Sequence, residues 1–402
     1  MLRQVQEHLV DLPICGEVAP GFEPVRDAFI SNFTELGDAG AGVCIYLNGM
    51  PVVDLAGGWS WKSAGVPYDK SCLQLVFSST KGATAICAHI LAERGLLDYG
   101  DPVANYWPQF ANNGKASVTV AQILSHQAGL PTISEPMDLD LVLQWDPIVE
   151  ALANQEPFWE PGSAHGYHAL TFGWLVGEIV RRVSGKSIGE FFAQEVARPL
   201  GLEFWIGLPE DQEQRVSKLR LGPLPDFRHL DPEMKKIAAD IFAPGSLMLR
   251  ALTLNGSFGQ FMGGEGPFNK REVHAAEVPA ANGITNARSL ARMYAATVGP
   301  VDGVRLINSS TVASATQVQS EGPDRVLTAP SRFGLGFMLD RKDFAPLLSP
   351  ASFGHSGAGG SLGFADPVHN VGFGYVMNQM RLGLAGDERP VRLIRALEGC
   401  LK

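Results

Sequence analysis

Two side chains that could carry out covalent chemistry together stand three residues apart, at Ser78 and Lys81. In a helix this spacing places both on one face and turns Ser79 away. A serine hydroxyl becomes an effective nucleophile when a neighbouring base takes its proton. A lysine amine can be that base if burial lowers its pKa, and residues 75–77 and 83–91 around the pair are mostly apolar. The spacing therefore predicts nucleophilic catalysis, with a helix cap beside a solvated lysine as the alternative.

Two later segments could complete such a site. Tyr167 follows a Pro-Gly turn at residues 161–162 and precedes an apolar-periodic run over residues 170–183, which predicts a helix. The positive end of a helix dipole favours negative charge, so we expect this position to ease ionisation of the phenol. Residues 353–361 are glycine-rich and precede a strand-like run at 371–377. Glycines there let the backbone approach a ligand and leave N–H groups free to donate. Taken singly, a buried aromatic and a glycine-rich connection would explain these segments equally well.

The three segments, in this order, resemble the motifs of the serine β-lactamase and penicillin-binding-protein superfamily. The chain is most similar to the class C-like branch called family VIII carboxylesterases, in which a tyrosine supplies the second motif and His-x-Gly or Trp-x-Gly the third. Residues 95–103 and 124–130 are also typical of the superfamily. The resemblance covers nearly the whole chain and implies a β-lactamase-like α/β (α+β) fold, with the active site between a sheet domain and a helical domain.

Carried over residue by residue, the resemblance implies a function for each motif. Ser78 would attack an ester carbonyl, and Lys81 and Tyr167 would share the role of general base. The backbone N–H groups of Ser78 and Ala358 would form the oxyanion hole. The remaining substrate-binding residues that it implies are Ala169, His355, Ser356 and Gly357. No metal and no organic cofactor is implied.

Two departures from the β-lactamase pattern bear on the substrate. Ala169 stands where those enzymes place Asn, and His355 where they place Lys. Both changes remove groups that hold the amide and carboxylate of a β-lactam, so we expect hydrolysis of short-chain carboxylic esters. The alternatives on the same fold are an amide or peptide hydrolase (for a D-amino-acid peptide, an amide oligomer or, weakly, a β-lactam) and an acyltransferase. A non-catalytic binding module is a more remote alternative, because all three catalytic residues are present.

Composition is that of an ordinary enzyme with a small-molecule substrate. The chain has 402 residues, a formal net charge of −10, a pI of about 5.4 and a mean hydropathy of +0.04. The acidic balance argues against nucleic acid or an anionic membrane surface as a partner. The sequence contains no run of about eighteen apolar residues, so no membrane span is predicted. The five cysteines are scattered and lack metal-ligand spacing, which predicts free thiols in a reducing compartment. The first residues lack the apolar core of a signal peptide, so we expect a cytoplasmic protein.

The strand signals lie at the two ends of the chain. A hairpin is predicted where residues 42–47 and 51–57 meet at Asn48-Gly49, and further strands at 333–339, 352–356, 363–365 and 371–377. Helices are predicted at 82–97, 118–124, 170–183, 188–196, 287–298 and 390–401. We therefore expect an antiparallel sheet domain from residues 1–76 and 321–402, with a mostly helical domain, 77–320, inserted between them. Residues 207–279 show no assignable pattern.

Two other motifs could carry chemistry, but the residues around them argue against it. Residues 354–358 resemble the nucleophile elbow of α/β-hydrolases, but that elbow needs a helix directly after its serine, and a second strand is predicted there. His165 and His168 could form half of a metal site, but no third ligand stands at helical spacing nearby. We expect both histidines to be hydrogen-bonded loop residues.

Overall fold

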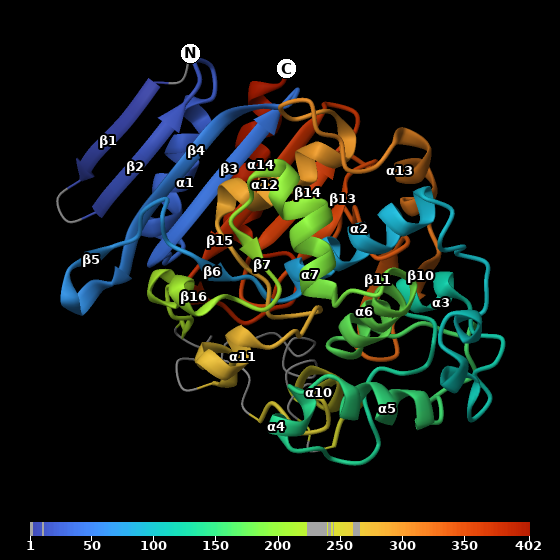
Figure 1. The fold of residues 1–402 in the computed structure, drawn as a ribbon. Coiled ribbons are helices and arrows are strands. Elements are labelled where there is room, and N and C mark those ends of the chain that lie inside the picture. Colours follow the sequence, from blue (N-terminus) through green and yellow to red (C-terminus); the bar gives the residue numbers. More distant parts are fainter. Residues whose placement is uncertain (1–2, 10–11, 223–238, 240–242, 244, 260–265) are drawn as a thin grey trace.

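Both ends of the chain contribute strands to one antiparallel sheet in this computed structural model, which describes residues 3–9, 12–222, 239, 243, 245–259 and 266–402. Ten of the eleven strands follow the order β1-β2-β4-β3-β15-β14-β13-β12-β11-β10, and β5 pairs with β4. In Figure 1 the blue strands of the first residues lie beside the orange and red strands of the last. The expected sheet from both chain ends is confirmed. The strands of this sheet are β1 (Arg3–Leu9), β2 (Leu12–Val18), β3 (Gly40–Leu47), β4 (Met50–Trp61), β5 (Val66–Pro67), β10 (Ser320–Pro323), β11 (Pro330–Phe333), β12 (Met338–Leu339), β13 (Phe353–Ser356), β14 (Leu362–Asp366) and β15 (Val371–Met377).

The rest of the described chain contains helices, two small sheets and the loops that connect them. The helices are α1 (Glu23–Glu35), α2 (Thr80–Glu93), α3 (Val120–Leu124), α4 (Leu139–Val142), α5 (Asp146–Asn154), α6 (Thr171–Ser184), α7 (Ile188–Phe192), α8 (Arg198–Leu200), α10 (Leu247–Thr253), α11 (Arg271–Ala275), α12 (Ala287–Val298), α13 (Ser309–Ala315) and α14 (Glu388–Cys400). The short sheets pair β6 (Gln74–Leu75) and β7 (Phe204–Trp205) with β9 (Ile284–Thr285), and β8 (Arg220–Leu221) with β16 (Gln379–Met380). No helix among these described residues is long and apolar enough to cross a bilayer.

The hairpin between β3 and β4 turns at the predicted dipeptide. Asn48 and Gly49 both have positive φ, 51° and 77°. A two-residue turn with positive φ at both positions matches the right-handed twist of the flanking strands. The prediction from Asn-Gly is therefore confirmed.

Alternate residues of β15 decide what covers each face of the sheet. A Cβ added at Gly372 or Gly374 would collide with the backbone of α12, so these glycines let that helix pack closely on the strand. Phe373 and Tyr375 point to the opposite face, where they share an apolar core with α1 and α14. The period-two alternation of the strand thus separates a helix-contact face from an aromatic face.

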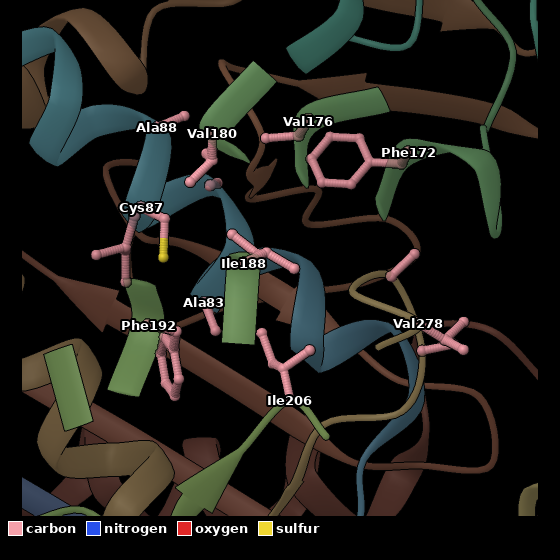
Figure 2. Packing of buried hydrophobic residues seen from close by; sticks show 14 of the residues in the cluster. Ala83, Cys87, Ala88, Phe172, Val176, Val180, Ile188, Phe192, Ile206 and Val278 are labelled. Carbon is pink, nitrogen blue, oxygen red and sulfur yellow. The ribbon is translucent and has the colours of Figure 1, made fainter. Parts of the chain in front are cut away.

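The other core surrounds α2. Residues of α2 contact α6 and α7 through apolar side chains, and Figure 2 shows Ala83, Cys87 and Ala88 facing Phe172, Val176 and Val180 of α6 and Ile188 and Phe192 of α7. Twelve of the fourteen residues of α2, from Thr80 to Leu91, are buried. Such a helix, buried on nearly every side among mostly apolar residues, supplies the dry environment that the lysine hypothesis needs.

Some predicted boundaries were wrong. The expected strand at 333–339 is divided into β11 and β12, because Gly336 takes φ 81° and donates its N–H to Leu124 O of the helical region. The helix expected at 82–97 begins and ends earlier, as α2. The strands β1 and β2 and the helix α1 were not predicted. Residues 207–279 contain β8, α10 and α11, with 223–238, 240–242, 244 and 260–265 outside the described residues.

The division into domains stays a prediction. α12 lies within the expected helical segment 77–320 but packs on the sheet, where the glycines of β15 receive it. In Figure 1 the helices α3 to α6 lie to one side of the sheet.

Candidate active site

Ser78 lies where the chain turns from a strand into a helix. It belongs to a 3-10 turn, η2 (Phe77–Ser79), between β6 and α2. Phe77 has φ 43°, a conformation that costs a bulky residue about 1–2 kcal/mol, so the surrounding structure holds this turn in place. Ser78 is half-buried, and its N–H is in a first helical turn, where such groups have no intrahelical acceptor.

Lys81 is fully buried and makes three contacts. Its Nζ lies 3.0 Å from Ser78 Oγ, 2.6 Å from Ala169 O and 3.1 Å from Ala280 O. Burial lowers the pKa of this amine well below its usual value of 10.5. A neutral amine has two hydrogens and one lone pair. If the two carbonyls accept both hydrogens of the neutral form, its lone pair faces the Ser78 hydroxyl.

Tyr167 lies on the other side of the nucleophile. Lys81 Nζ is 4.8 Å from the centre of its ring, and its phenol interacts with the Ser78 side chain. Burial raises the pKa of the phenol above its usual value of 10. The expectation that a helix terminus eases its ionisation was wrong, because α6 begins only at Thr171 and Tyr167 lies in the buried loop before it. The resting phenol is therefore a proton donor.

The described site contains the third motif as well. His355 on β13 is 2% exposed, and its ring centre is 5.9 Å from that of Tyr167. Nδ1 contacts Ser356 O at 2.7 Å, which assigns the proton to this nitrogen. Nε2 has no partner among the described residues. Burial lowers the pKa of His355 to about 3, so the imidazole is neutral and presents a lone pair.

Close contacts hold β13 against the nucleophile. Ser79, turned away from Lys81, donates its hydroxyl to His355 O at 3.1 Å. A Cβ at Gly357 would lie 2.1 Å from Val76 O, so only glycine permits this approach. Ser356 donates to Leu384 O at 2.8 Å, and β14 follows the motif in place of a helix. The nucleophile-elbow reading thus lacks both its helix and a base beside Ser356.

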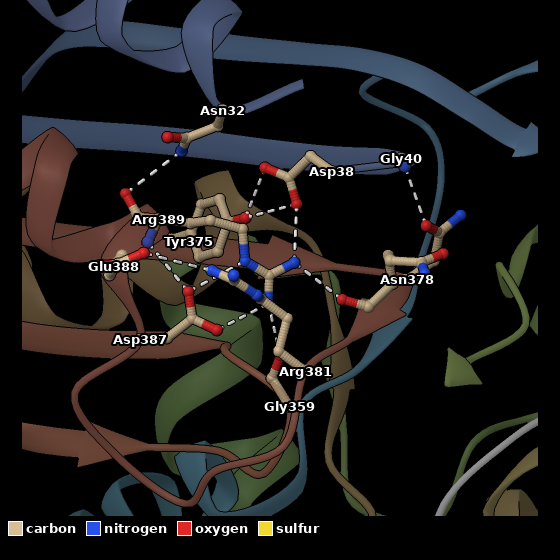
Figure 3. A network of polar contacts seen from close by, with 11 residues as sticks. Asn32, Asp38, Gly40, Gly359, Tyr375, Asn378, Arg381, Asp387, Glu388 and Arg389 are labelled. Atoms are coloured by element: carbon tan, nitrogen blue, oxygen red, sulfur yellow. Dashed lines mark hydrogen bonds and ion pairs between the residues drawn. The ribbon is translucent and has the colours of Figure 1, made fainter. Parts of the chain in front are cut away.

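A buried ion pair supports the turn that carries Ala358. No acceptor among the described residues takes the Ala358 N–H. The next carbonyl, Gly359 O, accepts from Arg389 Nη2 at 2.6 Å, and the same guanidinium contacts Asp38 Oδ1 at 2.9 Å and Asp387 Oδ2 at 2.8 Å. Figure 3 shows Arg389 at the centre of these contacts. Arg389 therefore ties α14, the chain before β3 and the turn after β13 to one another.

The histidine pair is engaged in hydrogen bonds. His168 contacts Gly166 O through Nδ1 at 2.6 Å and accepts from Leu130 N through Nε2 at 2.9 Å. His165 Nε2 lies 2.9 Å from Ser331 Oγ. Within the described residues, no three metal-binding side chains come together.

Sequence reasoning missed the environment of Tyr167. An apolar cluster, in which Trp159, Met248 and Phe333 pack with Tyr167 and Ala169, lines this side of the site. Asp324 accepts the backbone N–H of Tyr167. No spacing in the sequence signals this contact, since the two residues are 157 positions apart. A cavity of about 360 Å³ lies beside the third motif, lined by residues of 354–357, 381–388 and other segments.

Known proteins share this fold and much of this sequence. A family model described as Beta-lactamase matches residues 29–397. The esterase/beta-lactamase LipL of Mycobacterium tuberculosis is 37% identical over 376 residues, covering 91% of this chain and 83% of LipL. A crystal structure of a family VIII carboxylesterase is 38% identical with a TM-score of 0.85, covering 96% of this chain and 99% of that one. A penicillin-binding-protein homologue from Caulobacter crescentus is 37% identical with a TM-score of 0.83, covering 96% and 99%.

The fold and these similar proteins together define a serine hydrolase of the β-lactamase and penicillin-binding-protein superfamily. The chain belongs to the beta-lactamase family, as the match over most of its length shows. Its similarity to family VIII carboxylesterases agrees with the resemblance found in the motifs.

Proposed function

We propose that this enzyme is a carboxylesterase that hydrolyses short-chain esters through an acyl-enzyme on Ser78. The observation that carries the proposal is the fully buried amine of Lys81, placed 3.0 Å from Ser78 Oγ, with its pKa lowered well below the usual value by burial. A base held at hydrogen-bond distance from a serine is what covalent catalysis requires.

Acylation follows from this geometry. Ser78 Oγ forms a bond to the ester carbonyl carbon as its proton passes to Lys81 Nζ. The negative charge that develops on the carbonyl oxygen is stabilised by the N–H groups of Ser78 and Ala358, and loss of one such donor costs on the order of 3 kcal/mol. The C–O bond to the alcohol then breaks. Tyr167 gives its proton to the leaving oxygen and is reprotonated from Lys81.

Deacylation reverses these proton movements. Water enters in place of the alcohol, Lys81 takes its proton through Tyr167, and the hydroxide attacks the acyl carbon. Ser78 Oγ leaves and recovers its proton from Lys81. Both half-reactions begin and end with a neutral amine and a neutral phenol, which suits groups buried away from water.

The walls of the site favour uncharged substrates. Trp159, Met248 and Phe333 offer apolar surface beside Tyr167, and His355 offers a neutral acceptor nitrogen. A carboxylate facing that lone pair would be repelled. These features support an ester with an apolar acyl or alcohol group.

Labelling with a fluorophosphonate tests the nucleophile. We expect one labelled site, and Ser78→Ala should abolish both labelling and hydrolysis of p-nitrophenyl butyrate. Ser79→Ala is the matched control, since that hydroxyl points to β13 and the variant should still be labelled. Labelling that survives in Ser78→Ala but disappears in Ser356→Ala would overturn the assignment.

We keep the cytoplasm as the proposed location. All five cysteines are unpaired thiols, as expected in a reducing compartment. Activity recovered with a cytoplasmic marker after cell fractionation would support this placement, and recovery with secreted proteins would contradict it.

A further inference from the structure

A carboxylate from the sheet region holds the loop that carries Tyr167. Asp324 follows β10 and is 6% exposed. Its Oδ1 accepts the backbone N–H of Tyr167 at 3.0 Å and those of Val326 and Leu327 at 2.8 and 2.9 Å. Three N–H groups on one oxygen orient that oxygen tightly, since hydrogen bonds to a charged acceptor are about twice as strong as neutral ones.

The second oxygen extends the contact to the other side of the loop. Ser331 donates its hydroxyl to Asp324 Oδ2 at 2.8 Å and contacts His165 Nε2 at 2.9 Å. Arg325 N donates to His165 O at 3.1 Å. Asp324 therefore connects the turn between β10 and β11 to residues on both sides of Gly166.

The strand that follows this turn, β11, places an aromatic ring against the phenol of Tyr167. Phe333, at the end of β11, stacks on Tyr167 with an interplanar angle of 8° and ring centres 6.1 Å apart. The backbone of Tyr167 is thus held by Asp324 and its ring by Phe333. A loop fixed at both points has little freedom to move the phenol away from Ser78.

We propose that Asp324 is a positioning residue for proton transfer, which holds the Tyr167 phenol at Ser78 through the Tyr167 N–H. This inference rests on the proposed function, because it assigns Tyr167 the proton delivered to the leaving alcohol. The negative charge of Asp324 also raises the pKa of Tyr167, so it helps to keep the phenol protonated. A displacement of about 1 Å in such a group can cost on the order of 10²-fold in rate.

The test compares leaving groups in a double-mutant cycle. An ethyl ester needs a proton on its alkoxide, whereas p-nitrophenolate leaves without one. Asp324→Ala should lower kcat/KM for ethyl butyrate by at least ~10-fold and for p-nitrophenyl butyrate by much less, the same pattern as Tyr167→Phe. The double variant should be no slower on ethyl butyrate than Tyr167→Phe alone, because Asp324 acts through the missing hydroxyl.

Two further variants separate positioning from folding. Asp324→Asn keeps an Oδ1 acceptor for the three N–H groups and should retain most of the ethyl ester activity. Asp366→Ala is the matched control: Asp366 is also buried and accepts hydrogen bonds from Ser349, Ser352 and His369, at the far end of β14. It should lower the melting temperature without changing the ratio of ethyl to p-nitrophenyl activity.

The outcomes distinguish this inference from the proposed function. If Asp324→Ala slows wild type and Tyr167→Phe by the same factor, Asp324 supports only the fold and the inference is overturned. A shifted ester ratio in Asp366→Ala would overturn it too. If Tyr167→Phe alone leaves ethyl ester turnover intact, the role of Tyr167 in the proposed function fails and this inference with it. Fluorophosphonate labelling of Ser78 would report separately on the nucleophile.

Discussion

The protonation states of single residues organise the chemistry of this enzyme. Burial lowers the pKa of Lys81 and raises that of Tyr167, and both side chains lie beside Ser78, which favours a neutral base and a neutral acid in the proposed site. The proposed relay therefore starts without charge, and charge appears only as the ester is attacked. This arrangement follows from desolvation, which disfavours ammonium and phenolate alike.

The hydroxyl of Tyr167 should matter most when the leaving group is a poor one. Tyr167→Phe keeps the ring and its stacking on Phe333, so we expect normal stability and a loss on the order of 10²-fold or more in kcat for an ethyl ester. Tyr294→Phe is the matched control, because Tyr294 is fully buried and its hydroxyl has no partner among the described residues. Near-normal turnover in Tyr167→Phe, measured by release of ethanol, would show that Lys81 works alone.

Substrate preference is a second prediction at this scale. Ala169 cannot make the side-chain hydrogen bonds of an asparagine, and His355, with a pKa of about 3, carries no charge for a carboxylate. Each missing contact should cost roughly 1–3 kcal/mol. We expect kcat/KM for p-nitrophenyl butyrate to exceed that for nitrocefin or a penicillin by at least ~10²-fold, equivalent to about 2.7 kcal/mol. Comparable values would identify a β-lactamase.

At the scale of elements, the site depends on how β13 is held beside the start of α2 and how α14 supports the turn that follows β13. β13 is connected to the nucleophile by Ser79 and by the close approach of Gly357, and the turn after it is supported from α14 by Arg389. The proposed oxyanion hole would thus be built from two elements that are not adjacent in the sequence. Its geometry depends on contacts between them.

Removing the Arg389 guanidinium should damage both stability and catalysis. Arg389→Met leaves Asp38 and Asp387 without the guanidinium that pairs with both and frees Gly359 O, so we expect a loss of about 3–5 kcal/mol in the free energy of unfolding. The turnover of the remaining folded enzyme should also fall, because the Ala358 N–H loses its support. Arg392→Met is the control on the same helix: its pair with the more exposed Glu35 should contribute about 0–1 kcal/mol. Equal unfolding curves for the two variants in urea would contradict this view.

The whole molecule carries several buried neutral histidines, and these should make it sensitive to acid. Burial lowers the pKa of His89 and His168 to about 4 and that of His355 to about 3. Below pH 6.5 the unfolded chain binds these protons and the folded protein does not. Stability is therefore fully present above pH 6.5 and is lost as the pH falls toward 4, by up to about 1.4 kcal/mol per pH unit for each histidine.

Urea unfolding between pH 7.5 and 5 measures this slope. His89→Gln, which removes a buried histidine bonded to Tyr99 and Leu335 O outside the catalytic motifs, should make the slope shallower. A wild-type curve that is flat over this range would show that the histidines are not neutral in the fold.

By itself, the sequence determined the local elements and the identity of the chemical groups. The Asn48-Gly49 turn, α12, β15 and the spacing of Ser78 and Lys81 all depend on residues within a few positions of one another, where turn geometry and periodicity act. The tertiary structure alone decided the charge states. Burial in an apolar core lowers the pKa of Lys81, whose amine is held by Ala169 O and Ala280 O, and Asp324, 157 positions further along the chain, accepts the backbone N–H of Tyr167. The residues that bury and hydrogen-bond these groups lie 88 to 199 positions away in the chain. A local sequence pattern cannot predict such contacts.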